Sequence, residues 1–547
     1  MKCFLLCLFA KIRYIEKKLQ ICFLFLLLAL PSLAYGQLPQ IEWQLLYGEP
    51  SQDEQLEDVI LLPDGGYLAV GYHWDNSLVS YYDVLILRID AAGGLVWQKS
   101  YGGSLNDYMY ALTPTTDGGF MLVGSSESND GDVGSNQGGS DIWVLKIDTN
   151  GDLVWSRTYG GSSTDLAFDL TNDNQGGYYI TGTTASTDGN VTDNNGINDL
   201  WVLKIDDAGS LVWQQTYGGS LSENSRGIVY DAAQSQLIIA GATQSSDFDV
   251  SAHFGSFGND FWILRLQADN GSLLWEKTFG GTSGDAAQDL CLLPDGNFVV
   301  VGDILSSDGD VSQHIGQDDW WVIKIAGDTI VWQTTIGGIS FDQSHAIVVQ
   351  SDGSLLVCGN NFDSNITLPN YSYDTRIAKL AGSTGSVVWD GHWGGSQFDF
   401  ANALLPLPNS RFMMAGTTDS TDGDVGGGGH PCPENPRHGN HNAWLIMFEG
   451  AVSDAIYTPA PTNIACYPNP AVDFIYLQWP TDAPSLPDYN APVSVFGSDG
   501  SLVSQQKWDN LNAPLSIPVS SLPVGNYTVY IKTKQGTEYI SRFLVKK

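Results

Sequence analysis

A tryptophan-containing motif of the form Gly-x-Leu-Val-Trp returns seven times along this chain, closely followed in most copies by a Gly-Gly pair. Its tryptophans are spaced 54 to 62 residues apart, at Trp43, Trp97, Trp155, Trp213, Trp275, Trp332 and Trp389. Each full period also contains four strand-like runs joined by polar turns, as in 166–171, 178–184, 200–206 and 211–217. A period of this length is typical of a fold in which each copy is one small sheet.

The repeat predicts an all-β chain whose main domain, residues 37–450, is a seven-bladed β-propeller. One four-stranded copy cannot bury both faces by itself, so successive copies must stack on one another. The domain begins with a lone fourth strand, 42–47, and ends after a lone third strand, 443–448. We expect the first strand to complete the last blade, because this closes the ring and leaves no open edges. The seven tryptophans are then structural residues packed between blades.

The segments on either side of the propeller have different character. Residues 1–36 resemble a signal peptide, with basic residues from Lys11 to Lys18, an apolar run at 21–30 and small residues ending at Gly36. We expect cleavage after this segment and no membrane span later in the chain. A linker rich in Thr, Pro and Ala, 451–463, leads to a C-terminal domain, 464–547, with the strand pattern of a small Ig-like β-sandwich.

Charge and motifs limit the possible functions. The chain has 61 acidic and 24 basic residues, a formal net charge of −37, which repels phosphate backbones and excludes nucleic acid as an expected partner. The sequence contains no Gly-x-Ser-x-Gly elbow, no His-Glu-x-x-His and no phosphate-binding loop. No catalytic residue can therefore be assigned.

Acidic residues recur at two places on one face of the predicted propeller, where the long connections within and between blades lie. Long loops on a rigid scaffold are a usual place for binding. One carboxylate follows the Gly-Gly position of every repeat, at Asp53, Asp107, Asp165, Glu223, Asp285, Asp342 and Asp399. The loops between second and third strands add Asp-x-Asp-like pairs, each followed by an acid or amide at the start of the third strand.

These loop acids support two interpretations. Clustered carboxylates are ligands for hard cations such as Ca²⁺, the one cofactor that the sequence suggests. The candidate metal ligands are Asp130, Asp132, Asp141, Asp308, Asp310, Asp319, Asp422 and Asp424. Alternatively, these side chains cap their own turns by accepting backbone N–H groups, as Asp beside Gly commonly does.

The C-terminal segment carries the motif Tyr467-Pro468-Asn469-Pro470 with Asp473 just behind it, followed by Gly500, Gly525 and Tyr527 in matching contexts. In these residues it resembles the type A C-terminal sorting domain of the type IX secretion system of Bacteroidetes. The resemblance implies handling by the type IX machinery and its sorting protease. It also implies a protein that is secreted or attached to the outer-membrane surface.

A secreted or cell-surface binding or scaffold protein is the function that these features favour, with an unknown protein or glycan as its ligand on the loop-rich face. The alternative is a secreted polysaccharide-degrading enzyme on a propeller scaffold. That alternative requires inward-pointing acids in one or two blades that break the repeat.

Overall fold

The computed structural model describes two units of the chain. In the first, Tyr35–Ala451, it describes residues 38–48, 52–75, 81–255, 258–362, 373–425 and 441–450. In the second it describes the strands between 465 and 545 together with residues 522–523. The expected signal peptide and the linker lie outside the described residues. None of the described helices is long and apolar enough to cross a membrane.

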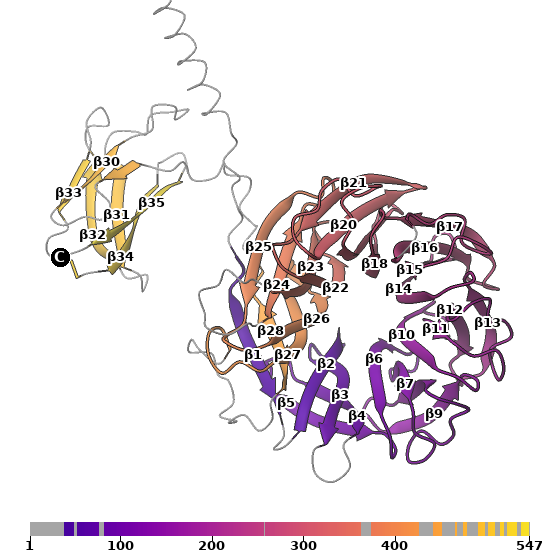
Figure 1. Cartoon of the computed structure of the whole chain (residues 1–547). Coiled ribbons are helices and arrows are strands. Elements are labelled where there is room, and N and C mark those ends of the chain that lie inside the picture. Colours follow the sequence, from indigo (N-terminus) through magenta and orange to yellow (C-terminus); the bar gives the residue numbers. More distant parts are fainter. Residues whose placement is uncertain are drawn as a thin grey trace, which may run out of the picture. The chain divides into compact units, whose positions relative to one another are not determined.

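The first unit is a seven-bladed β-propeller, as the repeat predicts (Figure 1). Six blades are built from consecutive strands, here called a to d from the innermost to the outermost. These are β2 (Gln52–Leu61), β3 (Tyr67–Asp75), β4 (Tyr82–Ile89), β5 (Leu95–Tyr101); β6 (Asp107–Pro114), β7 (Phe120–Ser126), β8 (Asp141–Ile147), β9 (Leu153–Tyr159); β10 (Asp165–Asn172), β11 (Gly177–Thr184), β12 (Asp199–Asp206), β13 (Leu211–Tyr217); β14 (Glu223–Asp231), β15 (Gln236–Thr243), β16 (Asp260–Gln267), β17 (Leu273–Phe279); β18 (Asp285–Leu292), β19 (Phe298–Ile304), β20 (Asp319–Ala326), β21 (Thr329–Ile336); and β22 (Asp342–Val349), β23 (Leu355–Asn361), β24 (Asp374–Leu380), β25 (Val387–Trp393).

The seventh blade joins the two ends of the propeller. It consists of β26 (Asp399–Pro406), β27 (Phe412–Thr418) and β28 (Asn442–Phe448), with β1 (Ile41–Tyr47) as its outermost strand. A short 3₁₀ turn, η1 (Pro408–Ser410), links β26 to β27. β1 runs antiparallel to β28, and Tyr47 pairs with Ala443 at the end of the ladder. The predicted closure by the first strand is therefore present.

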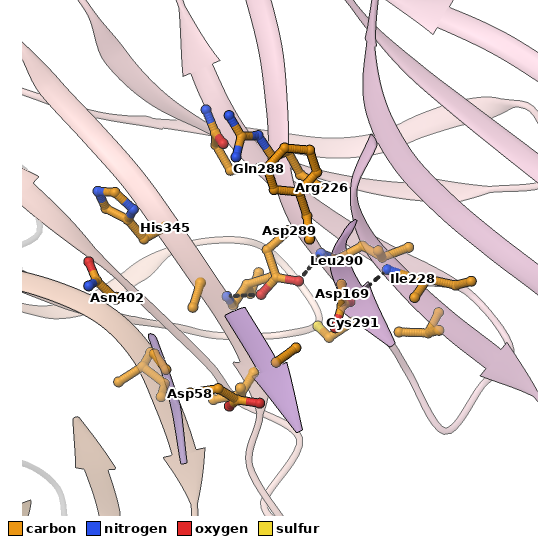
Figure 2. A pocket seen from close by; sticks show the side chains of 18 of the residues that line it. Asp58, Asp169, Arg226, Ile228, Gln288, Asp289, Leu290, Cys291, His345 and Asn402 are labelled. Carbon is orange, nitrogen blue, oxygen red and sulfur yellow. Dashed lines mark hydrogen bonds between the residues drawn. The ribbon is translucent and has the colours of Figure 1, made fainter. Parts of the chain in front are cut away.

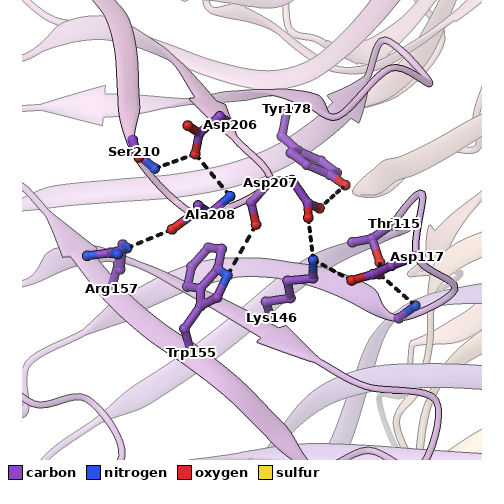
Figure 3. Close-up of polar contacts among 11 residues, drawn as sticks. Thr115, Asp117, Lys146, Trp155, Arg157, Tyr178, Asp206, Asp207, Ala208 and Ser210 are labelled. Atoms are coloured by element: carbon purple, nitrogen blue, oxygen red, sulfur yellow. Dashed lines mark hydrogen bonds and ion pairs between the residues drawn. The ribbon is translucent and has the colours of Figure 1, made fainter.

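Adjacent blades are joined by the motif aromatics of strand d. Trp155 in blade 2 packs against Gly209 in the c–d turn of blade 3, where an added Cβ would lie 2.9 Å from the indole ring. Gly209 has a φ of 75°, a conformation that glycine adopts without strain. Trp155 Nε1 donates to the carbonyl of Asp207 at 3.3 Å (Figure 3). The hydroxyl of Tyr159 donates to the carbonyl of Gly209 at 2.5 Å. The strand-d motif of blade 2 therefore packs against and hydrogen-bonds to the c–d turn of blade 3.

A buried lysine strengthens the same junction. Lys146 Nζ lies 2.7 Å from Asp117 Oδ2 in its own blade and 2.6 Å from Asp207 Oδ2 in the next blade. The hydroxyl of Tyr178 donates to the other oxygen of Asp207 at 3.0 Å (Figure 3). Bonding to Lys146 lowers the pKa of Asp117 to about 2, so this contact persists in mild acid.

The described strands of the second unit form two antiparallel sheets. One contains β29 (Ala465–Tyr467), β30 (Phe474–Gln478) and β33 (Leu515–Pro518). The other contains β31 (Ala491–Gly497), β32 (Leu502–Trp508), β34 (Gly525–Lys532) and β35 (Glu538–Val545). The region is all-β as expected, and its assignment as an Ig-like sandwich stays a prediction.

The motif tryptophans differ in burial, which generates a stability prediction. Trp389 is buried, whereas Trp97 is half-buried beside an exposed outer strand. Trp389→Ala should lower the free energy of unfolding by about 3–5 kcal/mol, and Trp97→Ala by roughly half as much, because the cost follows the buried volume removed. Chemical denaturation of the mature protein measures both. Equal losses would show that burial does not set the contribution of this motif.

Candidate functional site

Every innermost strand of the propeller contains a β-bulge at the same place. In each of the seven a–b ladders one residue of strand a has no partner at the register shift. The extra residue is accommodated by local twist, which re-aims its side chain. The seven bulge residues are Glu57, Tyr110, Phe168, Arg226, Gln288, His345 and Asn402. We call them the bulge ring.

All seven members of the bulge ring line one cavity of about 450 Å³ (Figure 2). This volume lies within the range of roughly 300–1,000 Å³ of small-molecule sites. Their chemistry differs in every blade, although the strands that carry them are copies of one another. The ring is thus a set of unlike side chains displayed by a repeated scaffold.

The ring is divided into two arcs. Blades 2 to 4 supply an aromatic and cationic arc, in which the rings of Tyr110 and Phe168 lie 5.8 Å apart and the Arg226 guanidinium lies 4.3 Å from the Phe168 ring centroid. Blades 5 to 7 supply amide and imidazole groups, from Gln288, His345 and Asn402. An aromatic wall opposite groups that can hydrogen-bond is the usual composition of a ligand pocket.

Neighbouring side chains fix the orientation of the polar arc. Asn402 Nδ2 donates to the Leu56 carbonyl at 2.8 Å, and Gln288 Nε2 donates to Asp303 Oδ2 at 3.0 Å. Because each amide nitrogen already donates to the protein, the amide oxygen of each side chain is the atom that remains to accept a hydrogen bond. His345 Nε2 lies 2.9 Å from Asn360 Nδ2, and burial beside Arg226 lowers the pKa of His345 to about 4. The imidazole is neutral near pH 7.

Glu57 is the ring acid and comes from blade 1. Gln55 Nε2 donates to its Oε1 at 2.6 Å, and the hydroxyl of Tyr72 is a second hydrogen-bond partner. Desolvation by burial raises the pKa of Glu57 to about 7, against the opposing effect of Arg226. Glu57 can therefore take up or release a proton at neutral pH.

Three aspartates each follow a bulge-ring residue directly, and each one connects the innermost strands of two adjacent blades. Asp58 accepts the N–H groups of Val59 and Leu112 at 2.7 and 3.0 Å, and so connects blade 1 to blade 2. Asp169 connects blades 3 and 4 in the same way through Ile228, and Asp289 connects blades 5 and 6 through Ile347 (Figure 2). Burial raises the pKa of Asp58 and of Asp289 to about 7.

Beyond the ring the cavity is lined by aliphatic side chains. Val229, Leu292, Val348, Val349 and Pro406 lie at or near the ends of their strands, where strand a meets the short a–b turn. The cavity therefore extends from the ring toward the short-turn face. The sequence instead favoured the loop-rich face, so the described cavity lies away from the expected place.

The loop acids act as turn caps where the structure gives their contacts. Asp130 Oδ1 accepts the Ser104 N–H at 2.8 Å, Asp132 Oδ2 accepts Gly102 at 3.3 Å, and Asp141 Oδ2 accepts Gln137 at 2.7 Å. The corresponding backbone donors are Thr282 to Asp308, Ile315 and Gly316 to Asp319, and Ser396 to Asp422. Asp310 and Asp424 are placed by their own N–H groups, which donate to Gly280 and Gly394 at 2.8 Å.

The carboxylates after the Gly-Gly pairs are buried caps as well. Asp165 Oδ2 accepts the Gly161 N–H at 2.8 Å and the Ser186 hydroxyl at 2.8 Å. In blade 1 the equivalent residue is Glu54 and not Asp53, because the preceding loop is one residue longer and Glu54 is the acid near Gly48. Within the described ranges, no three His, Cys, Asp or Glu side chains gather as a metal cage. The choice between calcium binding and turn capping is tested by the calcium titration described below.

Part of the sorting motif lies within the described strands. Tyr467 is in β29 and pairs with Tyr476, while Gly525 and Tyr527 are in β34 and pair with Val545 and Phe543. Pro468, Asn469, Pro470, Asp473 and Gly500 lie outside the described residues. Residues 465–546 match the family "Secretion system C-terminal sorting domain". The chain carries a type IX secretion sorting domain.

Other comparisons concern the propeller. A 229-residue stretch is 24% identical to the regulatory protein FlaEY of Caulobacter vibrioides, covering 39% of this chain and 23% of that relative. A quinohemoprotein alcohol dehydrogenase from Comamonas testosteroni is similar over 81% of this chain and 82% of its own, with 11% identity and a TM-score of 0.37. The WD40 domain of Toxoplasma gondii coronin is similar over 76% and 88%, with 11% identity and a TM-score of 0.40. Likenesses this low carry no argument about function.

Sequence reasoning missed the bulge ring. The sequence signal for the ring lies three residues after the carboxylate that follows each Gly-Gly pair, which in blade 1 is Glu54. The residue at this position differs in every repeat. Attention to positions that recur leads to caps and packing residues. A position that varies while its neighbours recur is the better indicator of a binding group in a repeat protein.

The raised carboxyl pKa values generate a prediction about pH. Asp58 and Asp289 have a higher pKa in the folded state than in the unfolded state, so they stabilise the fold in acid. This stabilisation is lost as the pH rises from about 4 to 7. We expect a higher melting temperature at pH 5 than at pH 8. Asp289→Asn, which cannot ionise, should show a smaller loss across this range. A melting temperature that rises toward pH 8 would contradict the assignment.

The turn-cap geometry also predicts the response to calcium. Because the loop carboxylates already accept backbone N–H groups, adding Ca²⁺ to chelator-treated protein should leave the melting temperature within about 1 °C. Isothermal titration with Ca²⁺ should give no binding heat. Several binding events with a raised melting temperature would instead make the loop acids calcium ligands.

Proposed function

We propose that this chain is an exported ligand-binding protein whose ligand is a small organic molecule held in the central channel by the bulge ring. The observation that carries this proposal is that seven unlike side chains, one from each copy of a repeated strand, line a single cavity. Packing between blades does not require such variety, since the contacts between blades recur from blade to blade.

The chemistry of the ring supports binding over a purely structural role. Gln288, His345 and Asn402 each keep one polar side-chain atom besides the one bonded to the partner already described, and the Arg226 guanidinium is exposed and makes no ion pair in the described propeller. Tyr110 and Phe168 add aromatic surface, with their rings tilted by 40°, against which a ligand can pack. Together these groups supply both orientation and contact area for a compact ligand.

The sorting domain supports where this binding takes place. It implies delivery by the type IX machinery and release or attachment at the outer-membrane surface. Cleavage of residues 1–36, removal of the sorting domain by its protease and an origin in Bacteroidetes belong to the same proposal. A protein or glycan partner on the loop-rich face is a further part of it, independent of the channel.

Glu57 favours a second candidate, a polysaccharide-degrading enzyme. It is an inward-pointing acid that breaks the repeat, and its pKa of about 7 suits proton transfer. This candidate predicts release of reducing ends from a polysaccharide and loss of that activity in Glu57→Gln. Binding without turnover favours the first proposal.

The channel proposal is tested by screening the mature protein against a panel of organic acids, amines and neutral sugars, with thermal shift followed by titration calorimetry. Phe168→Ala and Asn402→Ala should weaken a bound compound by about tenfold or more, since each removes a direct contact. The control is Asp130→Asn, a loop substitution far from the ring in sequence and outside the cavity lining. If no compound binds, or if ring and loop variants behave alike, the proposal fails.

A further inference from the structure

We infer that the ligand of this channel is an organic carboxylate with an apolar body, whose carboxylate is bound by Arg226 and His345 and whose body lies on the aliphatic wall of blades 4 to 7. The inference rests on the proposed channel site and names its ligand class. Three features of the cavity carry it: an unpaired guanidinium, an imidazole fixed as a donor, and the composition of the wall.

The carboxylates of Glu57 and Asp303 act on Arg226 electrostatically, but neither forms a direct ion pair with it. The guanidinium makes no ion pair in the described part of the chain, although most other lysines and arginines of the described propeller pair with an acid. Stacking over Phe168 at 4.3 Å holds the plane of the group and leaves its N–H edge for another partner. A planar fork of donors matches a carboxylate in two-point geometry.

The hydrogen-bond network fixes His345 as a second donor. The Ala401 N–H donates to Asn360 Oδ1 at 3.1 Å, so the other end of that amide, Nδ2, faces the imidazole. Nδ2 can only donate, and His345 Nε2 must accept. Nδ1 of the neutral ring therefore carries the proton, and none of the described residues accepts it. A ligand in the cavity meets His345 as a hydrogen-bond donor.

The remaining wall selects the body of the ligand. Val229, Leu292, Val348 and Val349 come from blades 4, 5 and 6, the blades that also supply Arg226 and His345. These side chains offer apolar area and no hydrogen bonds, so they favour an alkyl or aryl group over a sugar ring. This arrangement suits a ligand whose carboxylate head group lies at the bulge ring and whose apolar body extends toward the short-turn face of the propeller.

The acids around the ring do not exclude an anion. Asp58, Asp169 and Asp289 each accept two backbone N–H groups, which offsets their charge locally. Asp303 accepts Gln288 and both donors of Ser344. Glu57 is bonded to Gln55, on the side of the ring that blade 1 supplies. The surface acidity acts from farther away and is screened over about 8–10 Å at physiological salt.

The test is titration calorimetry of the mature protein with three probes of one chain length, octanoate, octanol and octylamine, and with glucuronate as a polar carboxylate. We expect octanoate to bind and the other three to bind at least tenfold more weakly. Arg226→Gln should weaken octanoate by roughly 10–100-fold, the range for a lost charge-assisted hydrogen bond. Arg157→Gln is the matched control, because Arg157 also lies over an aromatic ring, that of Trp155, but outside the cavity lining. His345→Phe should weaken octanoate and reduce the preference for it over octanol, because it removes one of the two donors to the carboxylate.

Each outcome has a defined meaning. Tighter binding of octylamine or glucuronate than of octanoate overturns the carboxylate or the apolar-body assignment, while the channel site itself stands. Equal octanoate affinity in Arg226→Gln and Arg157→Gln overturns the role of Arg226, provided that both variants melt within about 2 °C of the parent protein. If none of the four probes binds and the wider panel is also negative, the proposed function fails as well.

Discussion

The packing of each blade against the next is the interaction on which the rest of this structure depends. A four-stranded sheet with two apolar faces has no stable existence alone, and at five junctions the tryptophan of strand d contacts the glycine of the following c–d turn. Because every blade packs against a following blade, the packing between blades is complete only when the last blade meets the first. Pairing of β1 with β28 closes the ring and completes the seventh four-stranded blade.

Closure of the ring creates a channel lined by seven copies of strand a, and these strands determine where functional side chains can be placed. The bulge interrupts the a–b ladder at one level in all copies, and the N–H groups near it need acceptors. Asp58, Asp169 and Asp289 each serve two of these groups, one in their own blade and one in the next, so alternate blades suffice. Seven is odd, and blade 7 has no such aspartate; there the Asn402 amide instead donates to the Leu56 carbonyl of blade 1.

Much of the fold follows from the sequence because its causes are periodic. The repeated tryptophans, the turn signals and the single strands at the two ends specify blade number, strand order and closure. The burial of individual tryptophans was less predictable, since Trp389 meets Phe412 and Phe448 at the closing blade while Trp97 meets an ordinary turn. The site was not found because a bulge has no local signature here: Tyr110 and Phe168 look like any strand residues, and only the ring shows that their positions are equivalent.

The bulge also explains how such a scaffold can carry a site that the fold does not depend on. A residue without a ladder partner makes few of the contacts that hold blades together, so its side chain can change with little effect on packing. The neighbouring positions cannot, since Met109 and Ala167 are fully buried. Variation is therefore confined to one level of the channel, where all seven blades contribute to the same cavity. Arg226 is the clearest consequence: its exposed guanidinium lies over Phe168 and makes no ion pair with the described residues, so this position can carry a charged group without disturbing the packing of the blades.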